Sequence, residues 1–247
     1  MKKIICADYA EMSMTAAYIV AEQVRRKPES VIGFATGSTP IGTYERLRDL
    51  YECGYVDFSQ ATTFNLDEYY PIKRDNDQSY YYFMRENLFK HVNFSPANIN
   101  IPNGECADPA EECVEYEKKL IAVGGTDLQV LGIGKNGHIG FNEPDAKLSL
   151  TTCLVDLTQD TIDANSRFFA TPEDVPKQAI TMGMGGIFSS KHILLLINGK
   201  TKAPIVKALF SDFVSTQVPA SLLNLHNNVT VILDRETVEA LRAMPFS

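Results

Sequence analysis

The chain has few positive charges and no long apolar run. Among its 247 residues, 31 Asp and Glu outnumber 23 Lys and Arg, and the net charge is −8. A protein whose main ligand is the nucleic-acid backbone needs a basic face, so this balance argues against nucleic acid as a partner. A membrane-spanning helix needs about 20 apolar residues, whereas the longest apolar run, Ile193 to Ile197, is only as long as a strand. Lys2 and Lys3 are soon followed by Asp8, which is not expected of a signal peptide.

Cysteine and histidine are scarce as well. The five cysteines are odd in number and form no C-x-x-C pair, which is typical of reduced thiols in the cytoplasm. The four histidines, His91, His138, His192 and His226, do not have the spacing of metal ligands. We therefore expect a cytoplasmic protein that enters no membrane and holds no metal.

Short apolar runs alternate with stretches of helical spacing along the whole chain. Strands are expected at 30–35, 61–66, 128–131, 152–157, 192–197 and 229–233. Helices are expected at 11–26, 41–51, 79–91, 108–123 and 236–243, the last capped by Asp234. This pattern predicts an α/β fold with an open, mostly parallel, Rossmann-like sheet and helices on both faces. Without an internal repeat or a low-complexity linker, we expect one domain over residues 1–247, with an insertion or flap at about 144–176.

In such sheets ligands bind beyond the carboxyl ends of the strands, and three loops there carry polar residues. The first is Thr36-Gly37-Ser38-Thr39-Pro40, between an expected strand and an expected helix. Gly37 lets the backbone approach a ligand closely, Ser38 and Thr39 offer hydroxyl groups, and the free N–H groups of a helix start favour phosphate. An ordinary capped turn has the same residues, so both interpretations stay open.

The second loop contains two adjacent carboxylates, Asp67 and Glu68, directly after the expected strand at 61–66. A carboxylate that points into the crevice could take a proton from carbon, if its position and pKa suit that task. A solvated acidic turn, or a cap for the next helix, is the alternative.

The third loop contains a G-x-G-x-x-G pattern at Gly132, Gly134 and Gly137, with Asp156 about 20 residues later. A dinucleotide site needs a helix directly after the third glycine, but residues 138–144 bring another glycine and a proline. We therefore do not expect a dinucleotide cofactor.

The same third loop places an amide, an imidazole and a carboxylate within eight residues, at Asn136, His138 and Glu143. Histidine titrates near neutrality and can move protons on sugar hydroxyls. A carboxylate that accepts the other ring N–H would orient the imidazole. A buried structural histidine in a tight turn is the alternative interpretation.

Three segments together carry a family resemblance: residues 64–69 (FNLDEY), 132–144 (GIGKNGHIGFNEP) and 164–169 (ANSRFF). They closely resemble the glucosamine-6-phosphate deaminase family, and the resemblance runs from about Ala7 to the C-terminal helix. It implies a fold of the sugar-phosphate isomerase/deaminase type. It also implies conversion of glucosamine 6-phosphate and water to fructose 6-phosphate and ammonia, in amino-sugar catabolism, with no metal or organic cofactor.

The resemblance also assigns roles to individual residues. His138 would move a proton as the pyranose ring opens, Glu143 and Asn136 would orient it, and Asp67 would carry the C2 proton to C1. The residues implied for the phosphate are Thr36, Gly37, Ser38, Thr39, Arg167 and Lys202. The segment at about 144–176 would then be a lid that excludes water.

Two departures from the family pattern limit these expectations. Some members have Asp where this chain has Asn136; since an amide carries no charge, we expect Asn136 to orient His138 rather than to exchange protons. Residues 151–155 lack the basic side chains of the allosterically activated members, and the C-terminus is shorter. We therefore expect no activation by N-acetylglucosamine 6-phosphate, and either a monomer or a homo-oligomer. A 6-phosphogluconolactone hydrolase and a catalytically silent sugar-phosphate sensor remain as alternatives.

Overall fold

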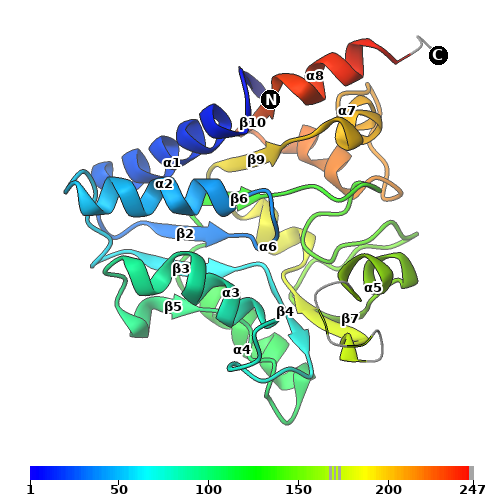
Figure 1. Cartoon of the computed structure of the whole chain (residues 1–247). Coiled ribbons are helices and arrows are strands. Elements are labelled where there is room, and N and C mark those ends of the chain that lie inside the picture. The colour runs from blue at the N-terminus through cyan, green and yellow to red at the C-terminus, as the bar shows by residue number, and fades with distance from the viewer. Residues whose placement is uncertain (167–168, 170, 172–173, 245–247) are drawn as a thin grey trace.

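A seven-stranded parallel sheet forms the centre of the molecule (Figure 1). The computed structural model describes residues 1–166, 169, 171 and 174–244. The strand order across the sheet is β1 (Lys2–Cys6), β10 (Val229–Asp234), β9 (Ile193–Ile197), β6 (Leu128–Leu131), β2 (Val31–Phe34), β3 (Thr62–Asn65) and β5 (Ile99–Asn100). Every neighbouring pair in this sheet is parallel. The predicted fold class is confirmed.

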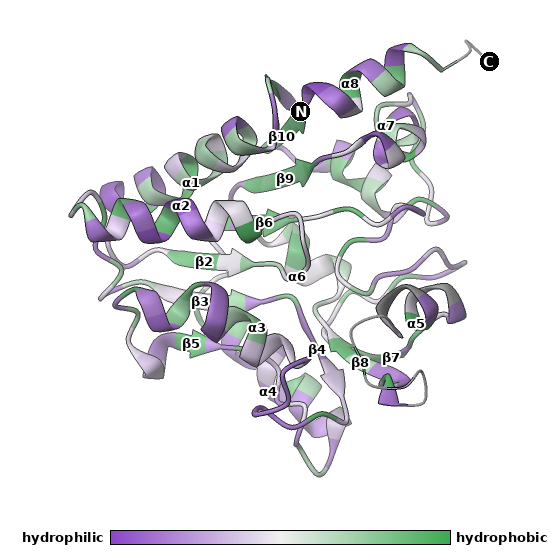
Figure 2. Cartoon of the chain, viewed as in Figure 1, coloured by the Kyte–Doolittle hydropathy of each residue, from purple (hydrophilic) through white to green (hydrophobic). Residues whose placement is uncertain are grey.

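Helices cover both faces of this sheet, and each face has its own hydrophobic cluster. The first face carries α1 (Tyr9–Arg26), α2 (Ile41–Glu52) and α3 (Tyr80–Asn87). The second face carries α4 (Pro109–Ala122), α6 (Met184–Phe188), α7 (Ala203–Leu209) and α8 (Arg235–Arg242). Figure 2 shows hydrophobic strands between helices whose outer sides are hydrophilic. None of the helices within the described ranges is long and apolar enough to cross a membrane.

Aspartate caps place several of these helices where the sequence predicts them. The Asp234 carboxylate accepts a hydrogen bond from the N–H of Thr237 at 2.8 Å, which confirms the expected cap of α8. The expected helix at 79–91 divides into α3 and a 3₁₀ turn at Phe89–His91. Further 3₁₀ turns in the described part of the chain are Pro96–Asn98, Lys200–Lys202 and Pro219–Leu225.

A second, antiparallel sheet of three strands packs beside the large one. Its order is β4 (Asp67–Tyr70), β8 (Gln178–Thr181) and β7 (Cys153–Asp156). The interpretation of Asp67–Tyr70 as a loop is therefore wrong: it is a strand, and pairing with the distant β8 decides this. The strand expected at 152–157 exists, but in this small sheet. Helix α5 (Gln159–Ser166) joins β7 to the segment that leads to β8.

The chain changes direction across the large sheet between β2 and β6. From β2 it proceeds through β3 to β5, and from β6 it proceeds through β9 to β10 on the other side. Four neighbouring strands, β9, β6, β2 and β3, therefore present their carboxyl ends next to one another around this switch point. In open α/β sheets this is where ligands bind.

Candidate active site

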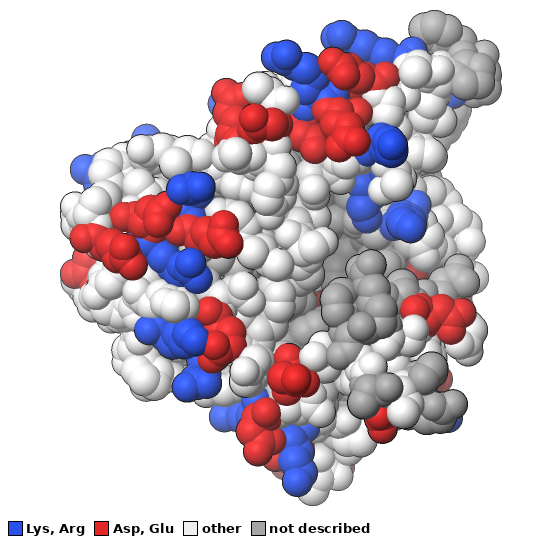
Figure 3. Space-filling view, in the orientation of Figure 1, with Lys and Arg blue, Asp and Glu red and all other residues white. Residues whose placement is uncertain are grey.

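The candidate residues predicted from three separate loops meet at this switch point. The loop after β2 carries Thr36–Thr39, the start of β4 after β3 carries Asp67, and the loop after β6 carries 132–144. Lys202 follows the adjacent strand β9. In Figure 3, Lys and Arg side chains gather on the right of the view, near α7, beside this region of the fold. The chain is acidic overall, so an anionic ligand requires local positive charge, and Lys202 is the described candidate for it.

Asn136, His138 and Glu143 form a connected group, as the sequence predicts. His138 Nδ1 lies 3.0 Å from Glu143 Oε1. The Asn136 amide donates to Glu143 Oε2 at 2.6 Å, and its carbonyl oxygen accepts from the His138 backbone N–H at 3.2 Å. Burial by itself would raise the pKa of Glu143, but the contacts with His138 and Asn136 outweigh burial and lower it. Glu143 is therefore a carboxylate that faces the imidazole.

The His138 ring lies directly over a glycine. A Cβ atom added at Gly134 would be 2.4 Å from His138 Nε2, so no other residue fits there without moving the ring. Backbone hydrogen bonds hold the same turn closed, since the Gly134 N–H donates to the His138 carbonyl at 2.9 Å. Because Nδ1 faces Glu143, Nε2 is the nitrogen left for a substrate. No helix follows Gly137 within the described loop at 132–144, so the glycine pattern is not a dinucleotide motif here.

The two adjacent carboxylates of β4 have different environments. Glu68 is 2% exposed and accepts hydrogen bonds from the backbone N–H groups of Tyr69, Tyr80 and Tyr81 at 2.8–2.9 Å. It therefore holds the start of α3 against the small sheet, which is the capping role that the sequence left open. Burial nevertheless raises the pKa of Glu68 to about 7.

Asp67 points the other way, toward the third loop. Its Oδ2 lies 3.6 Å from the position that a Cβ on Gly140 would occupy. Asp67 is 6% exposed, and burial, together with the nearby charge of Glu68, raises the pKa of Asp67 to about 8. A carboxylate with a raised pKa is a stronger base once it has lost its proton. The structure thus brings a base suited to carbon acids close to the loop that carries His138.

This buried carboxyl makes the stability of the protein depend on pH. The pKa of Asp67 is higher in the folded state than in the unfolded chain, so its contribution to stability is complete below about pH 4 and is lost as the pH rises to about 8. We expect Asp67→Asn to melt about 2–8 °C above the wild type at pH 8, because a change of about 1–2 kcal/mol shifts the melting temperature by about 2–4 °C per kcal/mol in a chain of this size. Calorimetry at pH 4.5 and 8 tests this, and an equal difference at both pH values would contradict it.

The loop after β2 has the shape expected of an anion site. Gly37 has a φ of 98°, a left-handed conformation that favours glycine, and Gly37 and Ser38 are exposed. The Tyr9 hydroxyl lies 3.2 Å and 3.1 Å from the carbonyl oxygens of Ser38 and Thr39, respectively, and bonds to both. These bonds hold the carbonyls on the α1 side of the loop. Helix α2 starts at Ile41, one residue after Pro40.

Two residues after β9 complete this part of the site. Lys202 is half-buried, and its Nζ donates to the carbonyl of Ile133 at 2.6 Å. Burial, with a smaller effect of Lys135, lowers the pKa of Lys202. A bound anion beside Lys202 would stabilise its protonated, positively charged form and so raise this pKa again. Asn198, which sequence reasoning missed, accepts a hydrogen bond from the Thr39 hydroxyl at 2.8 Å. Its place directly after a buried strand was a signal that could have identified it. Arg167 lies outside the described residues.

Asn198, directly after β9, accepts a hydrogen bond from Thr39 in the loop after β2 and so fixes the position of that loop. Removal of the Asn198 amide should therefore weaken ligand binding. We expect Asn198→Leu to raise the KM for a phosphorylated substrate about tenfold, as the loss of one positioning hydrogen bond would, with kcat within about twofold of the wild type. Initial-rate kinetics measure both constants. A fall in kcat at unchanged KM would assign Asn198 to the chemical step instead.

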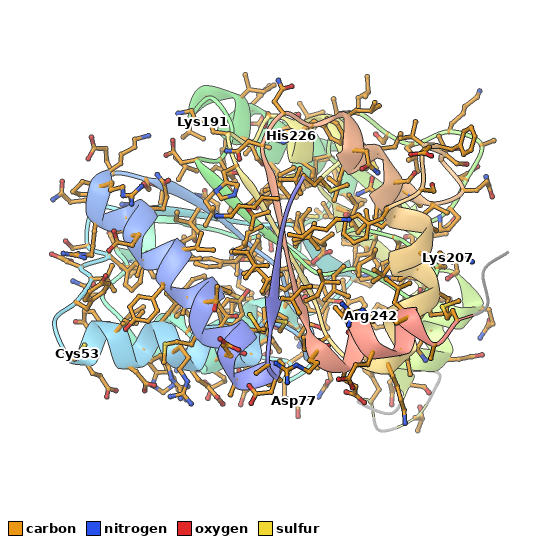
Figure 4. All side chains as sticks on the ribbon, turned by 90° about the horizontal axis from the view of Figure 1, so that it is seen from above. Cys53, Asp77, Lys191, Lys207, His226 and Arg242 are labelled. Carbon is orange, nitrogen blue, oxygen red and sulfur yellow. The ribbon has the colours of Figure 1, made fainter. Side chains whose placement is uncertain are left out.

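Other polar groups lie away from this site. Lys191 and His226 are close together on the far side from α1 and α2 (Figure 4), and the His226 ring bonds to the carbonyl of Ser190 at 2.8 Å. His192 bonds to Thr230 at 2.9 Å. Within the described part of the chain, no group of three His, Cys, Asp or Glu residues is placed to hold a metal ion. A hollow of about 430 Å³ beside Ile72 and Phe169 is lined by none of the candidate residues that the structure describes.

Comparison with known proteins gives consistent relatives over the whole chain. Residues 7–232 match the family described as glucosamine-6-phosphate isomerases/6-phosphogluconolactonase. The glucosamine-6-phosphate deaminase of Halothermothrix orenii is 55% identical over 241 residues, which cover 98% of this chain and 100% of that protein. The glucosamine-6-phosphate deaminase of Clostridioides difficile is 50% identical, with coverages of 98% and 97%.

Solved structures give the same result for the fold. The structure of a monomeric glucosamine-6-phosphate deaminase superposes with a TM-score of 0.93 at 45% identity, and covers 97% of this chain and 100% of that one. A 6-phosphogluconolactonase from Thermotoga maritima superposes with a TM-score of 0.74 at 22% identity, with coverages of 94% and 99%. At that identity the second likeness shows a shared fold alone.

Proposed function

Because the chain belongs to the family of glucosamine-6-phosphate isomerases and 6-phosphogluconolactonases, we infer that it has the activity for which its half-identical relatives are named. It is an isomerising deaminase that converts glucosamine 6-phosphate and water to fructose 6-phosphate and ammonia. Identity of about 50% over 98% of the chain is the observation that carries this conclusion.

The geometry supports a division of work between two groups. His138, held against Glu143 and Asn136, would move the proton between the sugar hydroxyl and the ring oxygen as the pyranose opens. Asp67 would then take the C2 proton, which gives an enolamine, and return a proton at C1. The imine that results at C2 takes up water and releases ammonia. These steps need one positioned base, Asp67, and one acid–base pair, His138 with Glu143. The positive amino group of the substrate would favour the ionised form of Asp67.

The phosphate of the substrate would bind between the loops after β2 and β9. The N–H groups and hydroxyls of residues 36–39 would then contact the phosphate from the loop after β2, and the Lys202 ammonium from the loop after β9. Arg167, carried over from the family pattern, belongs to the proposed lid at 144–176. We further propose that the chain acts in the cytoplasm, as a monomer or homo-oligomer, without metal or organic cofactor and without activation by N-acetylglucosamine 6-phosphate.

The deciding experiment measures ammonia release from glucosamine 6-phosphate in metal-free buffer, with fructose 6-phosphate as a second readout. Equal amounts of both products, with a hyperbolic saturation curve that N-acetylglucosamine 6-phosphate leaves unchanged, are the expected result. Binding of the sugar phosphate without turnover would instead indicate a sensor. Hydrolysis of 6-phosphogluconolactone without ammonia release would indicate a lactonase.

A further inference from the structure

A threonine on α5 contacts the carboxylate of the proton relay. The Thr161 hydroxyl donates to Glu143 Oε1 at 2.8 Å, and Thr161 is 8% exposed. The contact joins two elements that are distant in sequence, since Thr161 follows Glu143 by 18 residues. The sequence contains no signal for it, because nothing in the residue spacing places α5 on the loop at 132–144.

The contact falls on the oxygen that faces the imidazole. Oε1 of Glu143 receives the Thr161 hydroxyl and lies 3.0 Å from His138 Nδ1, while Oε2 receives the Asn136 amide. The carboxylate is therefore held from two sides, by the loop through Asn136 and by α5 through Thr161. The His138 contact itself is not aligned as a hydrogen bond in this conformation, so the two neutral donors set the direction of the carboxylate.

The Thr161 hydroxyl is itself held in place. The Thr158 hydroxyl donates to it at 3.0 Å, and the Thr161 N–H donates back to the Thr158 hydroxyl at 3.3 Å. The Thr161 hydroxyl oxygen therefore accepts from Thr158, and its one proton is donated to Glu143. A chain of two hydroxyl groups thus connects the first turn of α5 to the carboxylate.

We propose that Thr161 is a positioning residue for ring opening, whose hydroxyl holds the Glu143 carboxylate in the orientation in which it meets His138. This rests on the proposed deaminase activity, in which His138 moves the ring-opening proton. Thr161 touches no reacting atom and acts through Glu143 alone. Because a neutral donor stabilises the ionised carboxylate, its loss should disfavour that form.

The charged groups around Glu143 allow the effect of Thr161 on this carboxylate to be distinguished from the effects of other side chains. Among the described residues, His138 is the titratable side chain in contact with Glu143. Of the other charged side chains that the structure describes on the two elements, Lys135, Asp145 and Lys147 near the loop and Asp163 on α5 are all exposed. A change at Thr161 therefore acts on Glu143 and, through it, on the contact with His138.

The test compares Thr161→Val, which keeps the shape and removes the hydroxyl, with Thr161→Ser, which keeps the hydroxyl. We expect Thr161→Val to lower kcat about tenfold with KM little changed, and to move the acidic limb of the pH–rate profile up by about one pH unit. Thr161→Ser should restore both. Thr126→Val is the matched control: its buried hydroxyl donates to the Ser190 hydroxyl at 2.8 Å, away from the site and from the proposed lid, so its loss should leave kcat and the pH profile unchanged.

A second readout does not depend on turnover. In protein labelled with ¹³C at the glutamate side chain, the Glu143 signal is assigned by its loss in Glu143→Gln, and its titration should shift up in Thr161→Val alone. Wild-type kcat and titration in Thr161→Val, or equal losses in the Val and Ser variants, would overturn the proposal. Absence of deamination by the wild type would instead overturn the proposed function, and the titration would still decide the role of Thr161.

Discussion

Asp67→Asn is expected to abolish deamination while sugar-phosphate binding persists. The substitution keeps the size of the side chain and removes the only feature that the chemistry uses, a carboxylate able to accept a proton from carbon. General base catalysis contributes about 10²–10⁴-fold, and with a weakly acidic C–H bond we expect kcat to fall by about 10⁴. Proton exchange at C2, followed by NMR in deuterated water, should fall with it. Binding measured by calorimetry should change little, because the contacts proposed for the phosphate lie on other loops.

The neighbouring carboxylate supplies the control for this prediction. Glu68→Gln leaves one of three backbone N–H groups without its acceptor, so it should lower the free energy of unfolding by about 1–3 kcal/mol. Its kcat should remain within about tenfold of the wild type, because Glu68 faces the start of α3. Near-normal turnover in Asp67→Asn, or equal losses in both variants, would remove Asp67 from the role of base.

His138→Gln is expected to slow the reaction about 10²–10³-fold, and mainly at ring opening. Glutamine can fill the space over Gly134 and accept a hydrogen bond, but it cannot exchange a proton near neutral pH. The loss of rate in His138→Gln should therefore depend on whether the substrate has a sugar ring that must open. A four-carbon 2-amino-2-deoxytetrose 4-phosphate cannot close into a ring, because the phosphate occupies the oxygen that would close it. Turnover of this compound should fall much less than turnover of glucosamine 6-phosphate.

A distant histidine separates this effect from a general loss of structure. The His226 ring contacts Ser190 on the far side of the sheet, so His226→Gln should keep the wild-type ratio of the two rates. If His138→Gln lost the same factor on both substrates, His138 would act in the carbon proton transfer rather than in ring opening.

Much of the site could be predicted because its parts are local in sequence. Asn136, His138 and Glu143 lie within one loop, and their contacts are made across at most seven residues. The helix caps and the parallel strands follow from spacing and residue type in the same way. The loop after β2, which we propose binds the phosphate, joins a strand to a helix, an arrangement that the sequence can also describe.

Contacts between distant segments could not be predicted in this way. The choice between Asp67 and Glu68 as the base depends on α3, since Glu68 is occupied by backbone N–H groups 12 and 13 residues away. The same residues form a strand rather than a loop because β8, more than 100 residues later, pairs with them. Pairing of this kind depends on which segments the folded chain brings together, and residue type leaves little trace of it.

The chain's residues alone thus settled the fold class, the family and the presence of a histidine and a carboxylate within one loop, because periodicity and contiguous motifs are properties of local sequence. The tertiary structure decided which carboxylate faces the crevice, that Asn198 braces the loop after β2, and that Thr161 reaches Glu143. Each of these depends on the order of strands across the sheet and on burial, and both arise only when segments far apart in the chain pack together.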